Sequence, residues 1–225
     1  MKTLIVTALR KEFSALTEFL ASEGLEMERI EDKAVSARFP EYALLVATAG
    51  HGKAQFATAT QYLIDSHGPF DLVIATGAAG ALDANLFPGD VVIATEIVEH
   101  DYKLRFDGYT PAPRHPCSVA TGQTIMQSNQ KSRSFRIYMG PIASGDEDVV
   151  DAERATELCE QTEALCVAWE GAGGAKAARF NSIPFIEIRA VTDAADGEAA
   201  NSFQQHLTTA VKNIGQVLLE WLRGR

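Results

Sequence analysis

The stretch Leu72-Val73-Ile74-Ala75-Thr76-Gly77-Ala78-Ala79-Gly80 passes from a run of apolar residues into a segment that contains two glycines. A short apolar run that is rich in β-branched residues predicts a buried strand. The glycines that follow lack the Lys-Ser/Thr pair of a P-loop and the full GxGxxG spacing of a dinucleotide site. We therefore expect a tight turn after this strand, where glycine lets the backbone approach a helix or a ligand.

Similar apolar runs occur along the whole chain, and helical patterns separate them. We expect core strands at residues 4–6, 43–46, 72–74, 91–93 and 183–191. Strands that are apolar on both faces belong to a covered sheet, and the intervening helices supply the cover. The alternation predicts an α/β fold, and a length of 225 residues is ordinary for one domain, residues 1–225.

Three segments carry the spacing of an amphipathic helix. Phe13, Leu16 and Leu20 share one face of the first, and residues 53–66 form the second. In the last, apolar residues recur at helical spacing, and Ser202 is in position to cap the first turn. These residues are Phe203, Leu207, Val211, Ile214, Val217, Leu218 and Trp221.

The composition excludes several classes of partner. The chain carries 30 acidic and 20 basic residues, a net charge of −10 without a basic cluster, which argues against nucleic acid. Three cysteines without CxxC spacing argue against a disulfide framework and a thiolate zinc site, so we expect no metal, no cofactor and a cytoplasmic location. No run approaches the roughly 18 apolar residues of a spanning helix, and we expect no signal peptide and no membrane contact.

Periodicity fails between His100 and Lys131, where Pro111, Pro113 and Pro116 follow in quick succession. We expect one long loop here. Long loops in compact domains are usually lids, binding loops or interfaces, so this loop is expected to flank a site.

Polar residues directly follow the first and last predicted strands. Arg10, Lys11 and Glu12 follow the first, and Thr192-Asp193-Ala194-Ala195-Asp196 ends the last. Ligands of open α/β sheets bind beyond the carboxyl ends of the strands, so Glu12 and Asp193 can meet in one pocket. Two carboxylates in an apolar cleft divide into acid and base, because burial and mutual repulsion separate their pKa values.

Several segments in a fixed order carry a resemblance. They are residues 75–82, Pro88-Gly89-Asp90-Val91-Val92, His100-Asp101, Ser144-Gly145-Asp146, Trp169-Glu170-Gly171-Ala172 and residues 183–197. Together they resemble the nucleoside phosphorylase/nucleosidase family over nearly the whole chain, and the nearest branch looks like methylthioadenosine/S-adenosylhomocysteine nucleosidase. The resemblance implies a central mixed, twisted sheet flanked by helices, and hydrolysis of the N-glycosidic bond of a purine nucleoside to free base and a ribose derivative.

The resemblance also implies roles for individual residues. Asp193 matches the acid that protonates or hydrogen-bonds the purine N7, and Glu12 matches the carboxylate that orients and deprotonates the attacking water. Glu170 matches the residue that binds the ribose hydroxyls, and Arg189 would support the carboxylates as a fixed cation. Phe203 matches an aromatic residue that reaches the neighbouring subunit's pocket, so a homodimer is implied. The other candidates for substrate binding are His51, Ala78, Gly80, Asp148, Val149, Trp169 and Thr192.

Each of these residues also has a simpler interpretation. Glu12 can be a first-turn carboxylate favoured by the helix dipole, and Asp193 a turn or cap residue. Glu170 can be an exposed acid at a helix start, and Trp169 a core residue. Arg189 can form a salt bridge of little consequence. We interpret His100-Asp101 as a local hydrogen-bonded pair.

Three departures from the family pattern bear on function. Ala78 replaces a serine, Asp148 a phenylalanine that stacks on adenine, and Ala168 a glutamate near the ribose. The base would then be recognised by backbone groups of Val149 and stacked on Trp169, and a changed 5′ substituent or a different purine, including futalosine-type nucleosides, fits the pattern.

Two other functions stay open. A purine nucleoside phosphorylase would need a phosphate-binding hydroxyl and arginines around a dianion, and Ala78 lacks the hydroxyl, so water is favoured as nucleophile. A nucleoside-binding module that has lost catalysis fits the three substitutions. Retention of Glu12 together with Asp193 argues against it.

Overall fold

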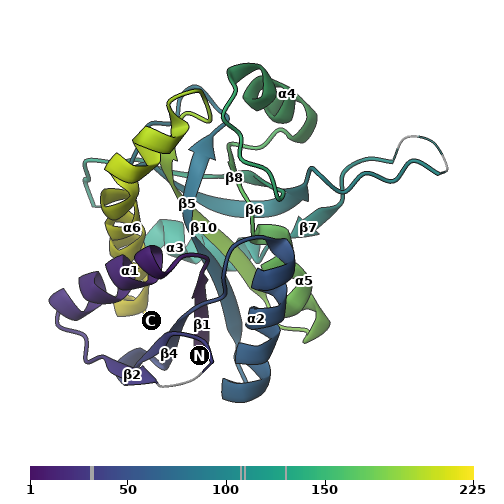
Figure 1. Cartoon of the computed structure of the whole chain (residues 1–225). Coiled ribbons are helices and arrows are strands. Elements are labelled where there is room, and N and C mark those ends of the chain that lie inside the picture. Colours follow the sequence, from purple (N-terminus) through teal and green to yellow (C-terminus); the bar gives the residue numbers. More distant parts are fainter. Residues whose placement is uncertain (31–32, 107, 109, 130) are drawn as a thin grey trace.

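Apolar strands lie at the centre of the molecule and amphipathic helices cover them (Figure 1). The computed structural model describes residues 1–30, 33–106, 108, 110–129 and 131–225. The strands in these ranges are β1 (Thr3–Thr7), β2 (Glu28–Ile30), β3 (Ser36–Phe39), β4 (Leu44–Thr48), β5 (Leu72–Ala81), β6 (Val91–Glu99), β7 (Arg114–Pro116), β8 (Ile137–Ser144), β9 (Cys166–Ala168) and β10 (Phe185–Asp193). The helices are α1 (Arg10–Ser22), the 3-10 turn η1 (Pro40–Tyr42), α2 (Lys53–His67), α3 (Val119–Ser128), α4 (Ala152–Thr162), α5 (Gly171–Phe180) and α6 (Ala199–Arg223).

The strands form one mixed sheet in the order β10-β6-β8-β9-β5-β1-β4-β3-β2, with β7 added to β6. β5 pairs in parallel with β1 and β10 and antiparallel with β9, while β10 also pairs antiparallel with β6. Strands β5, β9, β8, β6 and β10 therefore close into a ring. The predicted α/β fold with a central mixed sheet is confirmed. The carboxyl ends of the parallel strands β1, β5 and β10 meet at one edge, where a ligand is expected.

The helices pack in pairs on the two faces of the sheet. α1 packs against α6, and α2 against α5, so each face receives an apolar cover (Figure 1). The buried face of α6 includes Leu207, Val211, Ile214 and Leu218, as its periodicity predicts. The predicted cap at Ser202 is wrong, because α6 begins three residues earlier at Ala199 and Ser202 lies within its first turn.

The glycine segment after residue 74 is strand and not the predicted turn. β5 continues to Ala81, and Gly77 and Ala78 pair with Arg189 and Ala190 of β10. Gly80 pairs with Val167 of β9 as well. The partners that hold this segment extended lie about ninety residues or more along the chain, so local composition alone favoured a turn.

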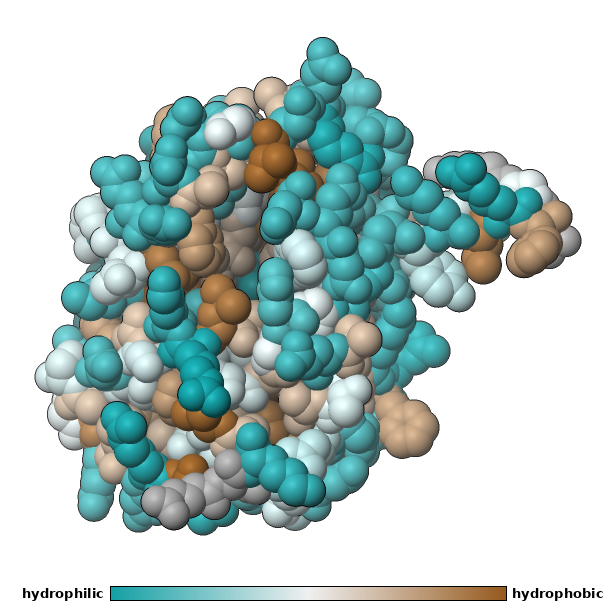
Figure 2. Space-filling view, in the orientation of Figure 1, coloured by the Kyte–Doolittle hydropathy of each residue, from teal (hydrophilic) through white to brown (hydrophobic). Residues whose placement is uncertain are grey.

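The predicted loop from His100 to Lys131 is wrong in its second half, which contains β7 and α3. Residues 107, 109 and 130 of that prediction lie outside the described residues. The first half contains an arm, described at residues 102–106, 108 and 110–113, that projects from the body and carries hydrophilic and hydrophobic side chains (Figure 2). Across the described ranges, no helix has the length and apolarity that a membrane crossing requires.

Candidate active site

Glu12 and Asp193 line one cavity of about 350 Å³ at the carboxyl ends of β1, β5 and β10. The parallel strands bring them there from opposite ends of the chain. Every residue that the sequence singled out for the site lines this cavity. They are Glu12, His51, Ala78, Gly80, Asp148, Val149, Trp169, Glu170, Arg189, Thr192, Asp193 and Phe203.

Glu12 is buried, and both of its carboxylate oxygens accept hydrogen bonds from backbone groups. Oε2 accepts from the N–H of Leu9 at 2.9 Å, which satisfies the start of α1. Oε1 accepts from the N–H of Ala78 at 2.9 Å. Burial raises the pKa of Glu12, although the Arg189 guanidinium and these two N–H groups act in the opposite direction. A carboxylate with a raised pKa is a better base near neutral pH than an ordinary glutamate.

Arg189 lies beneath the cavity and holds several acidic groups at once. Its Nη2 donates to Glu170 Oε2 at 3.0 Å, its Nε donates to Glu187 Oε1 at 2.5 Å, and its Nη1 donates to the Ala78 carbonyl at 3.2 Å. Burial opposes the charge of the guanidinium, but the carboxylates of Glu187, Glu170 and Glu12 outweigh it and raise the pKa of Arg189. Arg189 is therefore the fixed cation of the site.

Glu170 precedes α5 and is buried at the wall of the cavity. Besides Arg189, it accepts a hydrogen bond from the N–H of Gly52 at 3.3 Å. The Nε2 atom of His51 lies 3.9 Å from Glu170 Oε1, and the imidazole stacks on Trp169 with ring centroids 4.0 Å apart. The two simpler interpretations, an exposed acid and a core tryptophan, do not describe Glu170 and Trp169, because both line the cavity.

Asp193 ends β10 after an irregularity in the strand. The pairing of β10 with β5 shifts between Val191 and Asp193, so that Asp193 and not Thr192 lies opposite Gly80. Its carboxylate accepts hydrogen bonds from Thr192 Oγ1 at 2.7 Å and from the N–H of Ala195 at 3.0 Å. Burial raises the pKa of Asp193, against the lowering effect of these two donors. The environment thus favours a protonated acid more than that of an exposed aspartate does.

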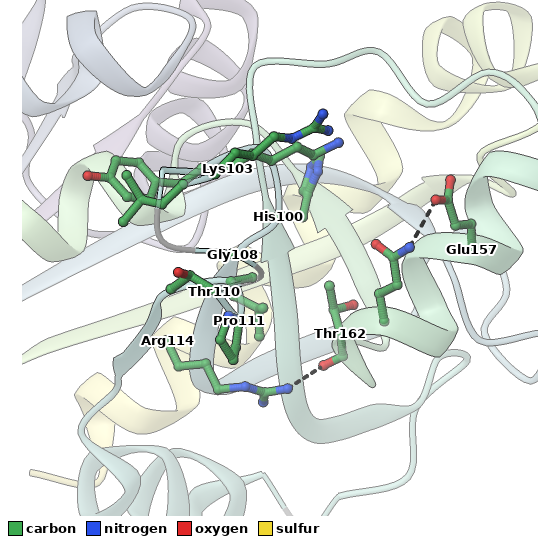
Figure 3. A pocket seen from close by; sticks show the side chains of 14 residues that line it. His100, Lys103, Gly108, Thr110, Pro111, Arg114, Glu157 and Thr162 are labelled. Carbon is green, nitrogen blue, oxygen red and sulfur yellow. Dashed lines mark hydrogen bonds between the residues drawn. The ribbon is translucent and has the colours of Figure 1, made fainter.

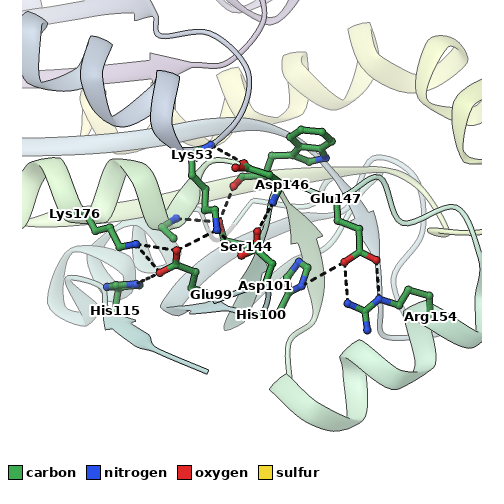
Figure 4. A network of polar contacts seen from close by, with 12 residues as sticks. Lys53, Glu99, His100, Asp101, His115, Ser144, Asp146, Glu147, Arg154 and Lys176 are labelled. Carbon is green, nitrogen blue, oxygen red and sulfur yellow. Dashed lines mark hydrogen bonds and ion pairs between the residues drawn. The ribbon is translucent and has the colours of Figure 1, made fainter. Parts of the chain in front are cut away.

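A network of charged residues holds the loops around the cavity (Figure 4). Lys53 Nζ donates to Glu99 at 3.1 Å and to Asp101, and Lys176 donates to the same Glu99. The N–H of Lys53 donates to Asp146 Oδ1 at 2.7 Å, so the start of α2 is tied to the loop after β8. That loop carries Asp148 and Val149, which line the cavity.

The local pair predicted for His100 and Asp101 is wrong. Asp101 instead bonds to Lys53 and to the N–H of Asp146, which is 2.9 Å from its Oδ2. His100 is buried with its Nδ1 3.7 Å from Glu147, and burial lowers its pKa. His100 and Asp101 therefore interact with residues that the fold brings close, and they are not hydrogen-bonded to each other.

A larger cavity, of about 620 Å³, lies between the arm and α4 (Figure 3). Its described lining contains Lys103, Arg105 and Arg114, with Glu157 as the one carboxylate. Glu157 is bound to Arg154 at 2.6 Å. The described lining of this cavity lacks a pair of buried carboxylates such as Glu12 and Asp193, which line the smaller cavity. Across the described residues, no group of three or more His, Cys, Asp and Glu side chains is arranged to hold a metal ion.

The profile of the family described as "Phosphorylase superfamily" matches residues 2–223. The chain belongs to the phosphorylase superfamily. Among its relatives, the 5′-methylthioadenosine/S-adenosylhomocysteine nucleosidase of Staphylococcus carnosus is 33% identical over 186 residues, 80% of this chain and 81% of the relative. The nucleosidase of the same name from Actinobacillus succinogenes is 31% identical over 233 residues, 99% of this chain and 98% of the relative.

Solved structures of the superfamily share the fold over the full chain. The nucleosidase of Neisseria meningitidis in complex with methylthio-immucillin-A has a TM-score of 0.88 at 28% identity and covers 100% of both chains. Futalosine hydrolase of Helicobacter pylori has a TM-score of 0.88 at 27% identity, covering 100% of this chain and 98% of the other. The likeness thus extends to two named hydrolases.

Phe203, in the first turns of α6, lines the cavity of its own chain, and its contact with a neighbouring subunit stays a prediction. The site of this superfamily member contains one further residue that the sequence analysis did not single out. Glu187 was missed, since it was taken as part of an apolar strand. The signal was a charged residue between Ile186 and Ile188, two positions before Arg189 and on the same face of the strand.

Proposed function

We propose that this protein hydrolyses the N-glycosidic bond of a purine nucleoside of the methylthioadenosine/S-adenosylhomocysteine type, releasing the free base and a ribose derivative. The observation that carries the proposal is the convergence of Glu12 and Asp193 on one cavity of about 350 Å³. Small-molecule sites have volumes in this range. Membership of the superfamily and the similarity to named nucleosidases support it.

Asp193 is the proposed general acid. When the C1′–N9 bond breaks, its electron pair goes to the base, and a proton given to N7 lowers the barrier where negative charge develops. The raised pKa keeps the proton available. After transfer, Thr192 Oγ1 and the N–H of Ala195 stabilise the carboxylate that remains.

Glu12 is the proposed base for the nucleophilic water. The water oxygen bonds to C1′ and a proton of the water passes to Glu12. Glu12 thus gains one proton and Asp193 loses one, and proton exchange with solvent restores both groups. The departing base leaves positive charge on the sugar, and the carboxylates of Glu12 and Glu170 stabilise it. Glu170 also accepts hydrogen bonds from the ribose hydroxyls, and the hydrogen bond from Arg189 keeps Glu170 in place.

We assign recognition of the base to backbone groups of Val149 and to stacking on Trp169. Both residues line the cavity, as do Asp148, His51 and Phe203. Ala78 offers no hydroxyl for a phosphate ion. The nucleosides to test are methylthioadenosine, S-adenosylhomocysteine and futalosine, which the relatives' names supply.

The deciding experiment measures base release from this panel by chromatography, with and without inorganic phosphate. We expect release in phosphate-free buffer that phosphate does not increase. Release that rises with phosphate and yields a sugar 1-phosphate would identify a phosphorylase instead. Tight nucleoside binding without turnover would identify the binding module.

We also propose a homodimer and a cytoplasmic location. The arm exposes Tyr102, Leu104 and Phe106, which are 46%, 49% and 102% accessible, and this concentration of large apolar side chains on one short segment favours a protein–protein contact. A second copy is the proposed partner, with its arm contacting the first. Cys117, Cys159 and Cys166 are free thiols, which suits a reducing compartment.

A further inference from the structure

Glu187 is a third carboxylate on the single guanidinium of the site, and it lies outside the cavity lining. It is fully buried on β10, two residues before Arg189. Its Oε1 accepts the Nε–H of Arg189 at 2.5 Å, the shortest of the contacts that this guanidinium makes. A buried carboxylate costs free energy unless it is paired and hydrogen-bonded.

The second oxygen of Glu187 has no direct partner. Oε2 is buried without a hydrogen-bond partner among the described residues, and it packs against the Cα of Gly171. A side chain at Gly171 would collide with it. The carboxylate therefore occupies the space that a side chain at Gly171 would need, and it directs its other oxygen at Arg189.

The planar guanidinium has few orientations once two of its edges are fixed. Glu187 takes the Nε edge and Glu170 takes Nη2, so Nη1 must point to the Ala78 carbonyl, beside Glu12. Gly77 marks this closeness, since a Cβ there would lie 2.5 Å from Glu12 Oε1 and 3.0 Å from Arg189 Nη1. Without Glu187, the guanidinium would be free to turn toward Glu12.

We propose that Glu187 is a positioning residue that holds Arg189 by its Nε edge and shares its charge, and thereby keeps Glu12 basic enough to take a proton from water. This rests on the proposed function. The buried carboxylates of Glu187 and Glu12 compete for one cation, so their protonation is coupled through Arg189. Burial raises the pKa of Glu187 as it does that of Glu12, and Arg189 opposes both shifts.

Few other titratable groups face Glu187. The thiols of Cys166 on β9 and Cys117 after β7 lie near it, and burial raises the pKa of each, so both are neutral. Glu170 faces it from the start of α5. The charged groups that face Glu187 are thus Arg189 and Glu170, and Arg189 connects it to Glu12.

The test compares Glu187→Gln with the wild type by the pH dependence of kcat/KM. Glutamine keeps an acceptor for Nε but removes the competing charge, so Arg189 lowers the pKa of Glu12 further. We expect the acidic limb to move to lower pH by about one unit, with KM nearly unchanged. Glu187→Leu also removes the acceptor, and we expect a further fall in kcat of about tenfold.

The matched control is Asp90→Asn. Asp90 is a buried carboxylate that accepts from the N–H groups of Phe87 and Arg136, outside the cavity lining. This variant should lower the Tm and leave the acidic limb in place. If Glu187→Gln behaves in the same way, Glu187 is only structural and the proposal is wrong.

A second readout separates this proposal from the proposed function. The carboxyl carbon of Glu12, labelled with carbon-13 and assigned through Glu12→Gln, reports the titration of Glu12 without turnover. A lower midpoint in Glu187→Gln supports the proposal, and an unchanged midpoint overturns it. If the wild type cleaves no nucleoside, the proposed function fails while this measurement still decides the role of Glu187.

Discussion

Glu12 Oε1 accepts a hydrogen bond from the N–H of Ala78 at 2.9 Å, across 66 residues of sequence. One side chain at the start of α1 thereby fastens itself to the middle of β5, which itself pairs with the strand that carries Arg189 and Asp193. The bond passes over Gly77, where no side chain intervenes. Glycine is required at this point because the carboxylate and the guanidinium both approach the backbone closely.

Gly77→Ala should therefore disable the site. The new Cβ would lie 2.5 Å from Glu12 Oε1 and must displace it. Misplacement of a catalytic group by about 1 Å can cost about 100-fold in rate, and we expect a loss of that order in kcat, with a lower Tm. Steady-state kinetics and thermal melting measure both effects. Gly197→Ala is the control, since a Cβ at Gly197 meets no atom within 4 Å; equal behaviour of the two variants would contradict the argument.

Asp193→Asn should nearly abolish base release. Asparagine retains the shape of the side chain but has no proton to give, so we expect kcat to fall by about 100-fold to 10,000-fold. The Asp196→Asn variant removes a nearby carboxylate that lies outside the cavity lining, and it should retain most of the rate. Undiminished release by Asp193→Asn would refute the assignment of the acid.

The network around Glu99 predicts acid sensitivity of the fold. Burial acts to raise the pKa of Glu99, but hydrogen bonds from Lys176, Lys53 and His115 outweigh it and lower the pKa below the ordinary value of 4.5. A lowered folded-state pKa contributes stability that is present above 4.5 and is lost as the pH falls through the folded value. The Tm should accordingly drop between about pH 5 and about pH 3.

Glu99→Gln tests the source of this drop. The variant lacks the titrating group, so its Tm should be lower at neutral pH and fall less steeply in acid. Differential scanning calorimetry across the pH series compares it with the wild type. A parallel acid decline in both proteins would mean that other carboxylates dominate.

The arm makes a prediction about assembly. Sedimentation equilibrium of the wild type should give twice the chain mass of 24.3 kDa. Phe106→Asp should shift the mass toward one chain, because Phe106 is fully exposed on the arm. Phe180→Asp alters a side chain that is 83% exposed at the end of α5 and should leave the mass unchanged. A wild type with the mass of one chain would exclude the homodimer.

The predicted strands at residues 4–6 and 91–93 lie within β1 and β6, because continuous apolar runs mark buried strands directly. The predicted strand at residues 43–46 overlaps β4, which begins one residue later at Leu44. The segment around Gly77 could not be predicted in this way. Its extended form depends on pairing with β10 and β9, and such partners leave no trace in the local sequence. Likewise, the prolines after His100 masked the short strand β7 and helix α3.

The site was predictable where it depends on strand ends. Glu12 follows one parallel strand and Asp193 ends another. Because ligands bind at the carboxyl ends of such strands, the sequence predicts that both residues lie in one site. Glu187 was not predicted as a site residue, because it lies in the interior of β10 and not at its end. The start of α6 was not predictable from Ser202, because the helix begins at Ala199 with Glu198 as its N-cap.

The shift in pairing between Val191 and Asp193 has a consequence for related chains. It makes the distance along the backbone from Arg189, and not the identity of Thr192, decide which way the acid points. A homologue shortened by one residue in that interval would retain every charged group and yet turn its aspartate toward the opposite face of the strand. Such a chain would show only a one-residue gap in an alignment and would be unable to protonate a bound base.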